Sequence, residues 1–139
     1  MKKRFTLMMM VVCFLMCIPL KMMAQTGTYE KLYLIGGLPK GGWSDALDRP
    51  FTTTDGETYK YVFTAEVTND CYFRVTTASQ QYRPQNNGDF VKTEFTTAYE
   101  GNDNKAWKLT MTKGKSYTLF FDLKNKQIKY SEGGSEGGS

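Results

Sequence analysis

An alternation of side-chain character along residues 58–67, "TYKYVFTAEV", constrains the fold more than any other feature of the sequence. Successive side chains of a β-strand point to opposite faces, so a period of two places one face on a core. The turn-forming segment "TDGE" precedes this run and "TND" follows it. The expected inward face consists of Tyr59, Tyr61, Phe63, Ala65 and Val67. The pattern predicts a half-buried strand bounded by turns.

Similar short segments fill the rest of the chain, and none shows the 3.6-residue apolar period of a long helix. Further strands are expected at 31–36, 71–77, 106–112, 116–123 and 127–130, with a weak one at 90–95. Six or seven strands within about 100 residues are typical of a sandwich of two antiparallel sheets. The predicted fold class is all-β, an immunoglobulin-like antiparallel β-sandwich of 6–8 strands.

Residues 1–24 have the layout of a secretory signal peptide, with a basic start, a central apolar run and the exit sequence "KMMAQ". The protein is therefore expected to be exported, and to be periplasmic, associated with the outer membrane or secreted. The remainder is expected to divide into an N-terminal linker at 25–30, a single β-sandwich domain at 31–131 and a flexible Gly/Ser/Glu tail at 132–139.

The positive charge of the chain belongs to this N-terminal segment. The whole sequence carries a formal net charge of +4, from 18 basic and 14 acidic residues. Removing Lys2, Lys3, Arg4 and Lys21 with the segment leaves 14 residues of each sign. A neutral mature chain gives no electrostatic support to binding nucleic acid or an anionic membrane, so neither is expected as a partner.

The sequence offers little catalytic chemistry. It contains no histidine, and Cys71 is the one cysteine that remains after residues 1–24 are removed. Histidine-dependent triads, histidine-ligated zinc and thiolate metal sites are therefore excluded. Most acids lie in turn sequences such as "SDALD" and "TDGE", where they bond to the backbone, which disfavours a glycosidase pair. We expect no enzyme activity, no catalytic residue, no metal and no cofactor. Cys71 is expected to be a small buried hydrophobic residue, with a reactive or intermolecular thiol as the alternative.

Two aromatic residues lie in expected loops rather than in strands. Trp43 follows several glycines in "LIGGLPKGGWSDALDRPF", residues 34–51, and Tyr82 lies in a polar loop at 78–89. An exposed ring can stack on the apolar C–H face of a sugar, and the neighbouring side chains of Arg83, Gln85, Asn86 and Asn87 can bond to sugar hydroxyls.

Each ring also has a purely structural interpretation. Trp43 could equally fold back as a lid over one end of the sandwich, because large aromatic rings are on average highly buried. Trp107 alternates with Leu109 and Met111, which favours the core, although it directly follows the polar turn "GNDNK" and could emerge at an edge. The predicted carbohydrate-binding residues are Trp43, Tyr82, Arg83, Asn86 and Trp107.

Several segments together resemble the carbohydrate-binding sandwich modules of the SusE and SusF type, from bacterial starch-utilisation systems. These segments are "LYLIG", the loop ending in "GGW", "DGETYKYVFTAEV", "YFRV" and the final stretch from "NKAWKL" to "KQIKY". The resemblance spans about residues 32–130 and implies a non-catalytic module that binds α-glucan by aromatic stacking. In it Trp43 corresponds to the "GW" aromatic, Trp107 to an aromatic before the penultimate strand, and Tyr82 to a loop position where the family often has tryptophan.

The implied partners are an oligo- or polysaccharide, α-glucan first, and outer-membrane glycan-uptake proteins. The sequence leaves a second function open, a structural or protein-interaction β-sandwich domain of an exported protein with no glycan site. It leaves the oligomeric state open as well.

Overall fold

The computed structural model describes residues 29–133, which form ten β-strands and no helix. Accordingly, this range contains no helix of the length and apolarity needed to cross a membrane. The predicted signal peptide at 1–24 lies outside the described residues, as do 25–28 of the predicted linker and 134–139 of the predicted tail. The strands are β1 (Tyr33–Gly36), β2 (Thr52–Thr53), β3 (Thr58–Thr64), β4 (Asn69–Thr76), β5 (Gln81–Arg83), β6 (Thr96–Thr97), β7 (Tyr99–Glu100), β8 (Trp107–Met111), β9 (Ser116–Asp122) and β10 (Gln127–Glu132).

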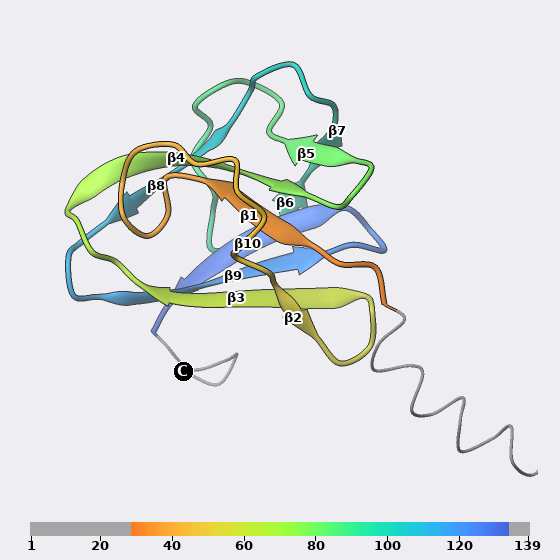
Figure 1. The fold of residues 1–139 in the computed structure, drawn as a ribbon, viewed down its shortest axis with the longest axis horizontal. Coiled ribbons are helices and arrows are strands. Elements are labelled where there is room, and N and C mark those ends of the chain that lie inside the picture. The colour runs from red at the N-terminus through yellow and green to blue at the C-terminus, as the bar shows by residue number, and fades with distance from the viewer. Residues whose placement is uncertain (1–28, 134–139) are drawn as a thin grey trace, which may run out of the picture.

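The strands pair into two antiparallel sheets that form the two layers of a sandwich (Figure 1). The first, here sheet A, has the order β1-β4-β5-β7, with β8 also paired to β4. The second, sheet B, has the order β2-β3-β9-β10-β6 and forms the lower layer in Figure 1. The predicted all-β antiparallel sandwich is confirmed.

The number of strands exceeds the predicted six to eight because the structure adds three short strands, β2, β6 and β7, of two residues each. The weak strand predicted at 90–95 is wrong, since this segment contributes only an isolated bridge from Phe90 to Lys108. Strand pairing resumes at β6 instead, where Thr96 and Thr97 pair with β10. These short pieces lie at the ends of their sheets and pair with one neighbour only.

The core lies between the sheets and follows the predicted period of two. In β3, Tyr59 and Phe63 are buried, and they pair with Phe121 and Tyr117 of β9. Val62 on the opposite face is exposed. Burial of these large rings is the main stabilising contribution in such a domain, because apolar area removed from water contributes about 25 cal/mol per Å².

The alternation between a buried and an outward face is clearest in strand β4. Cys71, Phe73 and Val75 are buried, whereas Tyr72 is exposed and Arg74 half-buried on the outer face of sheet A. Burial raises the pKa of the Cys71 thiol, which agrees with the predicted buried cysteine. Pairing of β4 with β1 on one side and with β5 and β8 on the other therefore places Tyr72 and Arg74 in the middle of this sheet's surface.

Candidate functional site

The glycine-rich loop after β1 returns beside β4 and is held by one side chain. The guanidinium of Arg49 donates hydrogen bonds to the carbonyl oxygens of Gly36, Leu38 and Ser44. The amide of Gly36 donates to Ser44 O at 2.9 Å and the amide of Ser44 donates back at 3.1 Å, which closes the loop. The segment that carries Trp43 is thus fixed at both ends.

Glycine is required where this loop leaves the sheet. Gly36 has a φ of +125°, and a Cβ there would lie 2.5 Å from the Cα of Phe73 and from Tyr72 O. Gly41 and Gly42 also have positive φ, 81° and 72°. Residues other than glycine are strained at these positive φ values. The glycines therefore allow the chain to turn and to approach β4 closely.

This loop presents the indole of Trp43 at the surface, with 42% of the residue exposed. Its Nε1 donates a hydrogen bond to Asp45 Oδ1 at 2.7 Å. The guanidinium carbon of Arg74 lies 4.8 Å from the ring centroid, a cation–π contact. Trp43 therefore does not form the alternative that was considered, a buried lid over one end of the sandwich, because its ring is exposed and oriented by two polar contacts.

A shallow hollow of about 310 Å³ lies beside this indole on the outer face of sheet A. Tyr72, also 42% exposed, contributes a second ring. The lining residues are Trp43, Tyr72, Arg74, Asn87, Asn104 and Ala106. The hollow therefore combines two large apolar faces with one guanidinium and two amides, groups that donate and accept planar hydrogen bonds.

The aromatic surface continues beyond Tyr72. Lys108 pairs with Tyr72 across β4 and β8, and its Nζ lies 5.7 Å from the Tyr72 ring centroid and 4.7 Å from that of Phe90. Phe90 is exposed. Adjacent strands are about 4.8 Å apart, so Tyr72, Lys108 and Phe90 form a row across the sheet.

Trp43 also borders a larger hollow, of about 470 Å³, formed by the glycine-rich loop together with Asp48, Arg49 and Tyr61. The donors of Arg49 are already used by the loop carbonyls. The smaller hollow is the stronger candidate because it has two exposed rings and unused polar groups.

The rings of Trp107 and Tyr82, which were predicted to bind carbohydrate, are buried. The prediction that they stack on a sugar at the surface is therefore wrong. Trp107 is 2% exposed and stacks on Phe73, with 5.6 Å between ring centroids. Tyr82 is 5% exposed and packs against Phe121 at 5.0 Å. The expected loop around Tyr82 forms β5, whose pairing with Val75 of β4 turns the ring inward. Burial also raises the pKa of the Tyr82 hydroxyl.

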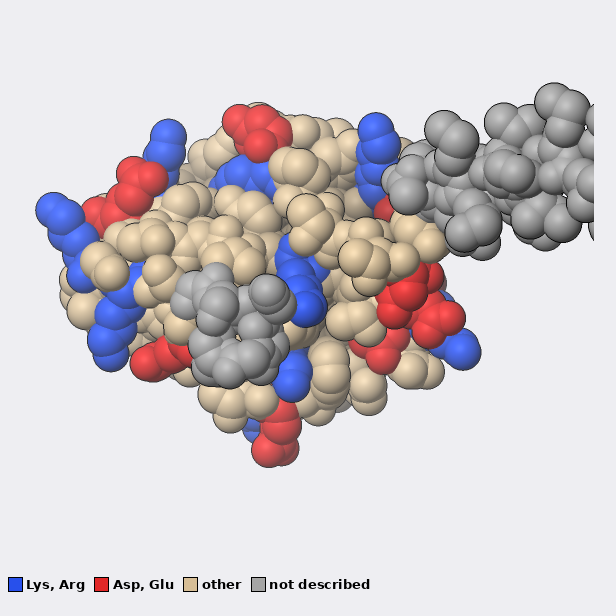
Figure 2. All heavy atoms as spheres, turned by 90° about the horizontal axis from the view of Figure 1, so that it is seen from below, with Lys and Arg blue, Asp and Glu red and all other residues tan. Residues whose placement is uncertain are grey.

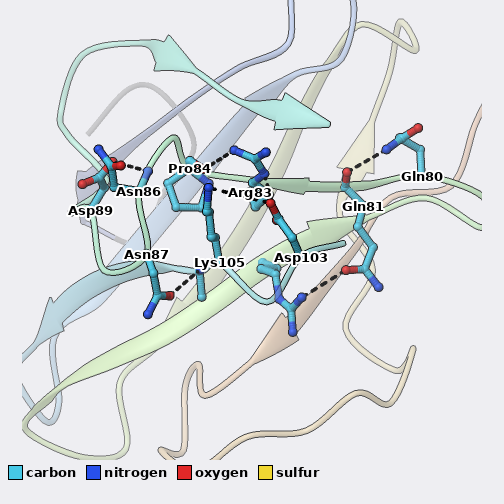
Figure 3. A network of polar contacts seen from close by, with 11 residues as sticks. Gln80, Gln81, Arg83, Pro84, Asn86, Asn87, Asp89, Asp103 and Lys105 are labelled. Atoms are coloured by element: carbon cyan, nitrogen blue, oxygen red, sulfur yellow. Dashed lines mark hydrogen bonds and ion pairs between the residues drawn. The ribbon is translucent and has the colours of Figure 1, made fainter. Parts of the chain in front are cut away.

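Arg83 and Asn86 lie in the neighbouring polar network rather than in the hollow (Figure 3). Arg83 Nε lies 3.1 Å from Asp103 Oδ1, and Arg83 Nη1 donates to Pro84 O at 2.9 Å. The backbone amide of Asn86 donates to Asp89 Oδ2 at 3.0 Å, while its side chain is exposed. These contacts shape the loop at 84–89, and it is the next residue, Asn87, that lines the hollow.

The sequence argument missed Tyr72, Arg74 and Asn104 as site residues, whereas it did name Asn87 among the groups that could bond to sugar hydroxyls. A signal for the first two was present, because the alternation "CYFRVTT" places them opposite Cys71 and Phe73. Asn87 is held by one hydrogen bond, in which Ala106 N donates to its Oδ1 at 3.0 Å. Nothing in the sequence indicated that Asn104 lies beside these residues.

The described residues 29–133 contain no group of three or more His, Cys, Asp or Glu side chains placed to hold a metal ion. The hollow itself is lined by no carboxylate. Its arrangement suits reversible binding of a molecule that has both an apolar face and hydroxyl groups.

No protein-family model and no curated protein matches this chain. One solved structure that does match is the ligand-induced structure of AmyP-SBD, a starch-binding domain. The two chains are 17% identical, the match covers 73% of this chain and 71% of that one, and the TM-score is 0.50. At this level of identity the likeness shows a shared fold.

Proposed function

We propose that this chain is a non-catalytic glycan-binding module and that the hollow between Trp43 and Tyr72 binds the sugar. One observation carries the proposal: two aromatic residues, each 42% exposed, Tyr72 on the central strand of sheet A and Trp43 on the loop beside it, lie next to a guanidinium and two amides. A pyranose stacks its C–H face on such rings and bonds its hydroxyls to the polar groups. Because Arg49 and Arg74 already hold the loop and the indole, little ordering entropy is lost on binding.

The proposed ligand is a starch-like α-glucan. The fold shared with the starch-binding domain AmyP-SBD supports this choice, as does the resemblance to SusE and SusF modules. We also propose export through the segment at 1–24, to the periplasm, the outer membrane or the medium, and cooperation with outer-membrane glycan-uptake proteins.

Affinity electrophoresis in native gels tests the proposal. The chain is expected to migrate more slowly in a gel containing amylopectin, and Trp43→Ala is expected to restore normal migration. Phe95→Ala is the matched control, because Phe95 is also an exposed ring, lies under Lys129 of sheet B and does not line the hollow. Equal migration of the unmodified chain with and without amylopectin would argue against α-glucan binding.

A further inference from the structure

The hollow between Trp43 and Tyr72 carries a positive charge that the protein leaves without a counter-charge. Arg74 is the one charged residue among its lining residues. No ion pair within 4.0 Å involves Arg74 in the part of the chain that the structure describes. A guanidinium stays charged at all physiological pH values, so this charge is permanent.

The hydrogen-bond donors of Arg74 are also largely unused. Within residues 29–133 its guanidinium makes one hydrogen bond, from Nη1 to the neutral Gln81 Oε1 at 3.2 Å. Its Nε is buried without a partner in the same range. A guanidinium presents five N–H groups in a planar fork that matches a carboxylate or a phosphate. Because the Nε is buried, the donors that Arg74 offers an anionic group, besides its charge, are those of Nη2 and the second N–H of Nη1.

Lys108, which pairs with Tyr72, adds a second positive charge on the outer face of sheet A. Its Nζ lies over the rings of Tyr72 and Phe90 and belongs to no ion pair among the described residues. Ring contacts of this kind attract a cation without neutralising it.

The carboxylates around this surface are already engaged by other donors. Asp45 accepts from Trp43 Nε1 at 2.7 Å, and Asp70 accepts from Thr110 Oγ1 at 2.7 Å. Asp103 is paired with Arg83 and Lys105 (Figure 3). Figure 2 looks at the molecule from the side of sheet B, where basic and acidic side chains are interspersed.

We propose that the hollow binds a glycan bearing a negatively charged group, the carboxylate of a uronic acid or a phosphate ester, more tightly than the neutral glycan of the same backbone. This inference rests on the proposed glycan binding and names the class of sugar that the site prefers. The anionic group bonds to Arg74 while the ring stacks between Trp43 and Tyr72. Lys108 attracts the charged group of the next sugar unit, placed along the row of Tyr72, Lys108 and Phe90.

Matched ligand pairs that differ only in charge test this preference by calorimetry. One pair is trigalacturonate and its methyl ester, and the other is maltotriose 6-phosphate and maltotriose. Because hydrogen bonds to charged groups are stronger than neutral ones, the charged member of a pair is expected to bind about tenfold more tightly. Its affinity is expected to fall between low salt and 0.5 M NaCl, while that of the neutral member stays constant.

Substitutions of the two cations test whether their charges cause the preference. Arg74→Met and Lys108→Met are each expected to reduce the charge preference and its salt dependence, and Arg74→Lys to keep part of both. Lys60→Met is the control, since Lys60 lies over Phe120 on sheet B, and it is expected to change neither. Circular dichroism checks that each variant is folded.

The outcomes distinguish the two proposals. If in both pairs the charged ligand binds no more tightly than its neutral partner, the preference for anionic glycans is overturned, and binding of maltotriose would leave the glycan-binding function standing. If the charge preference is undiminished in both Arg74→Met and Lys108→Met, the assignment to Arg74 and Lys108 is wrong. If neither these ligands nor amylopectin bind, both proposals fail.

Discussion

The guanidinium of Arg74 lies over the indole of Trp43, with 4.8 Å between the guanidinium carbon and the ring centroid. The two residues come from a glycine-rich loop and from the central strand of sheet A, so the contact joins a loop to a rigid element. Together with the bonds from Arg49 to the loop, it holds one aromatic ring at the surface in a fixed orientation. A ring held in this way is ready to stack on a ligand without first being ordered.

The two tryptophans are expected to report different environments. Trp43 is exposed and Trp107 is buried, so acrylamide is expected to quench the fluorescence of Trp107→Phe strongly and that of Trp43→Phe weakly. Maltoheptaose is expected to change the emission of Trp107→Phe only. A sugar-dependent signal in Trp43→Phe would place binding elsewhere on the molecule.

Trp107 contributes to stability rather than to binding. Trp107→Ala removes a buried ring stacked on Phe73 and is expected to lower the free energy of unfolding by about 3–5 kcal/mol. Trp43→Ala is expected to lower it by no more than about 1 kcal/mol, since the exposed ring leaves no core cavity. Urea denaturation followed by circular dichroism measures both. Equal losses in the two variants would contradict the burial difference.

Gly36 links the fold to the candidate site. Gly36→Ala puts a Cβ into the backbone of β4 at a φ that other residues rarely adopt, and is expected to cost more than about 1 kcal/mol and to weaken glycan binding by displacing Trp43. Gly114→Ala is the matched control, because Gly114 also has positive φ but has no atom within 4 Å of the position that a Cβ would take. The control is expected to lose some stability and to bind normally. Unchanged binding in Gly36→Ala would show that the loop tolerates the shift.

Asp55 is expected to give the stability a pH dependence at acid pH. Its Oδ1 accepts from the backbone amides of Glu57 and Thr58 at 2.8 and 3.0 Å, and these bonds hold the pKa of the carboxyl below its ordinary value. The contribution is present above the unfolded pKa of about 3.9 and is lost as the pH falls through the folded pKa. Asp55→Ala is therefore expected to melt at a lower temperature at pH 7, with a smaller difference below pH 3. A difference that is constant from pH 7 to pH 2 would contradict this assignment.

The sequence by itself determined which way the strand residues face. The alternation in 58–67 and in 71–77 depends only on the geometry of a strand, and it correctly placed Tyr59, Phe63 and Phe73 inward and Tyr72 outward. It also favoured the core for Trp107, and the ring is buried there. The glycines before Trp43 correctly indicated an irregular loop, because positive φ values are a local property.

Only the tertiary structure decided which of these residues meet. Tyr82 has no periodic partner in the sequence, and its ring is turned inward because β5 pairs with the preceding strand β4 and with the more distant β7. Contacts between segments that are distant along the chain bring Trp43, Tyr72 and Asn104 around one hollow. Such contacts depend on which strands pair and how the two sheets assemble, and the polarity pattern of a single strand shows which face is buried but not which residues lie opposite it.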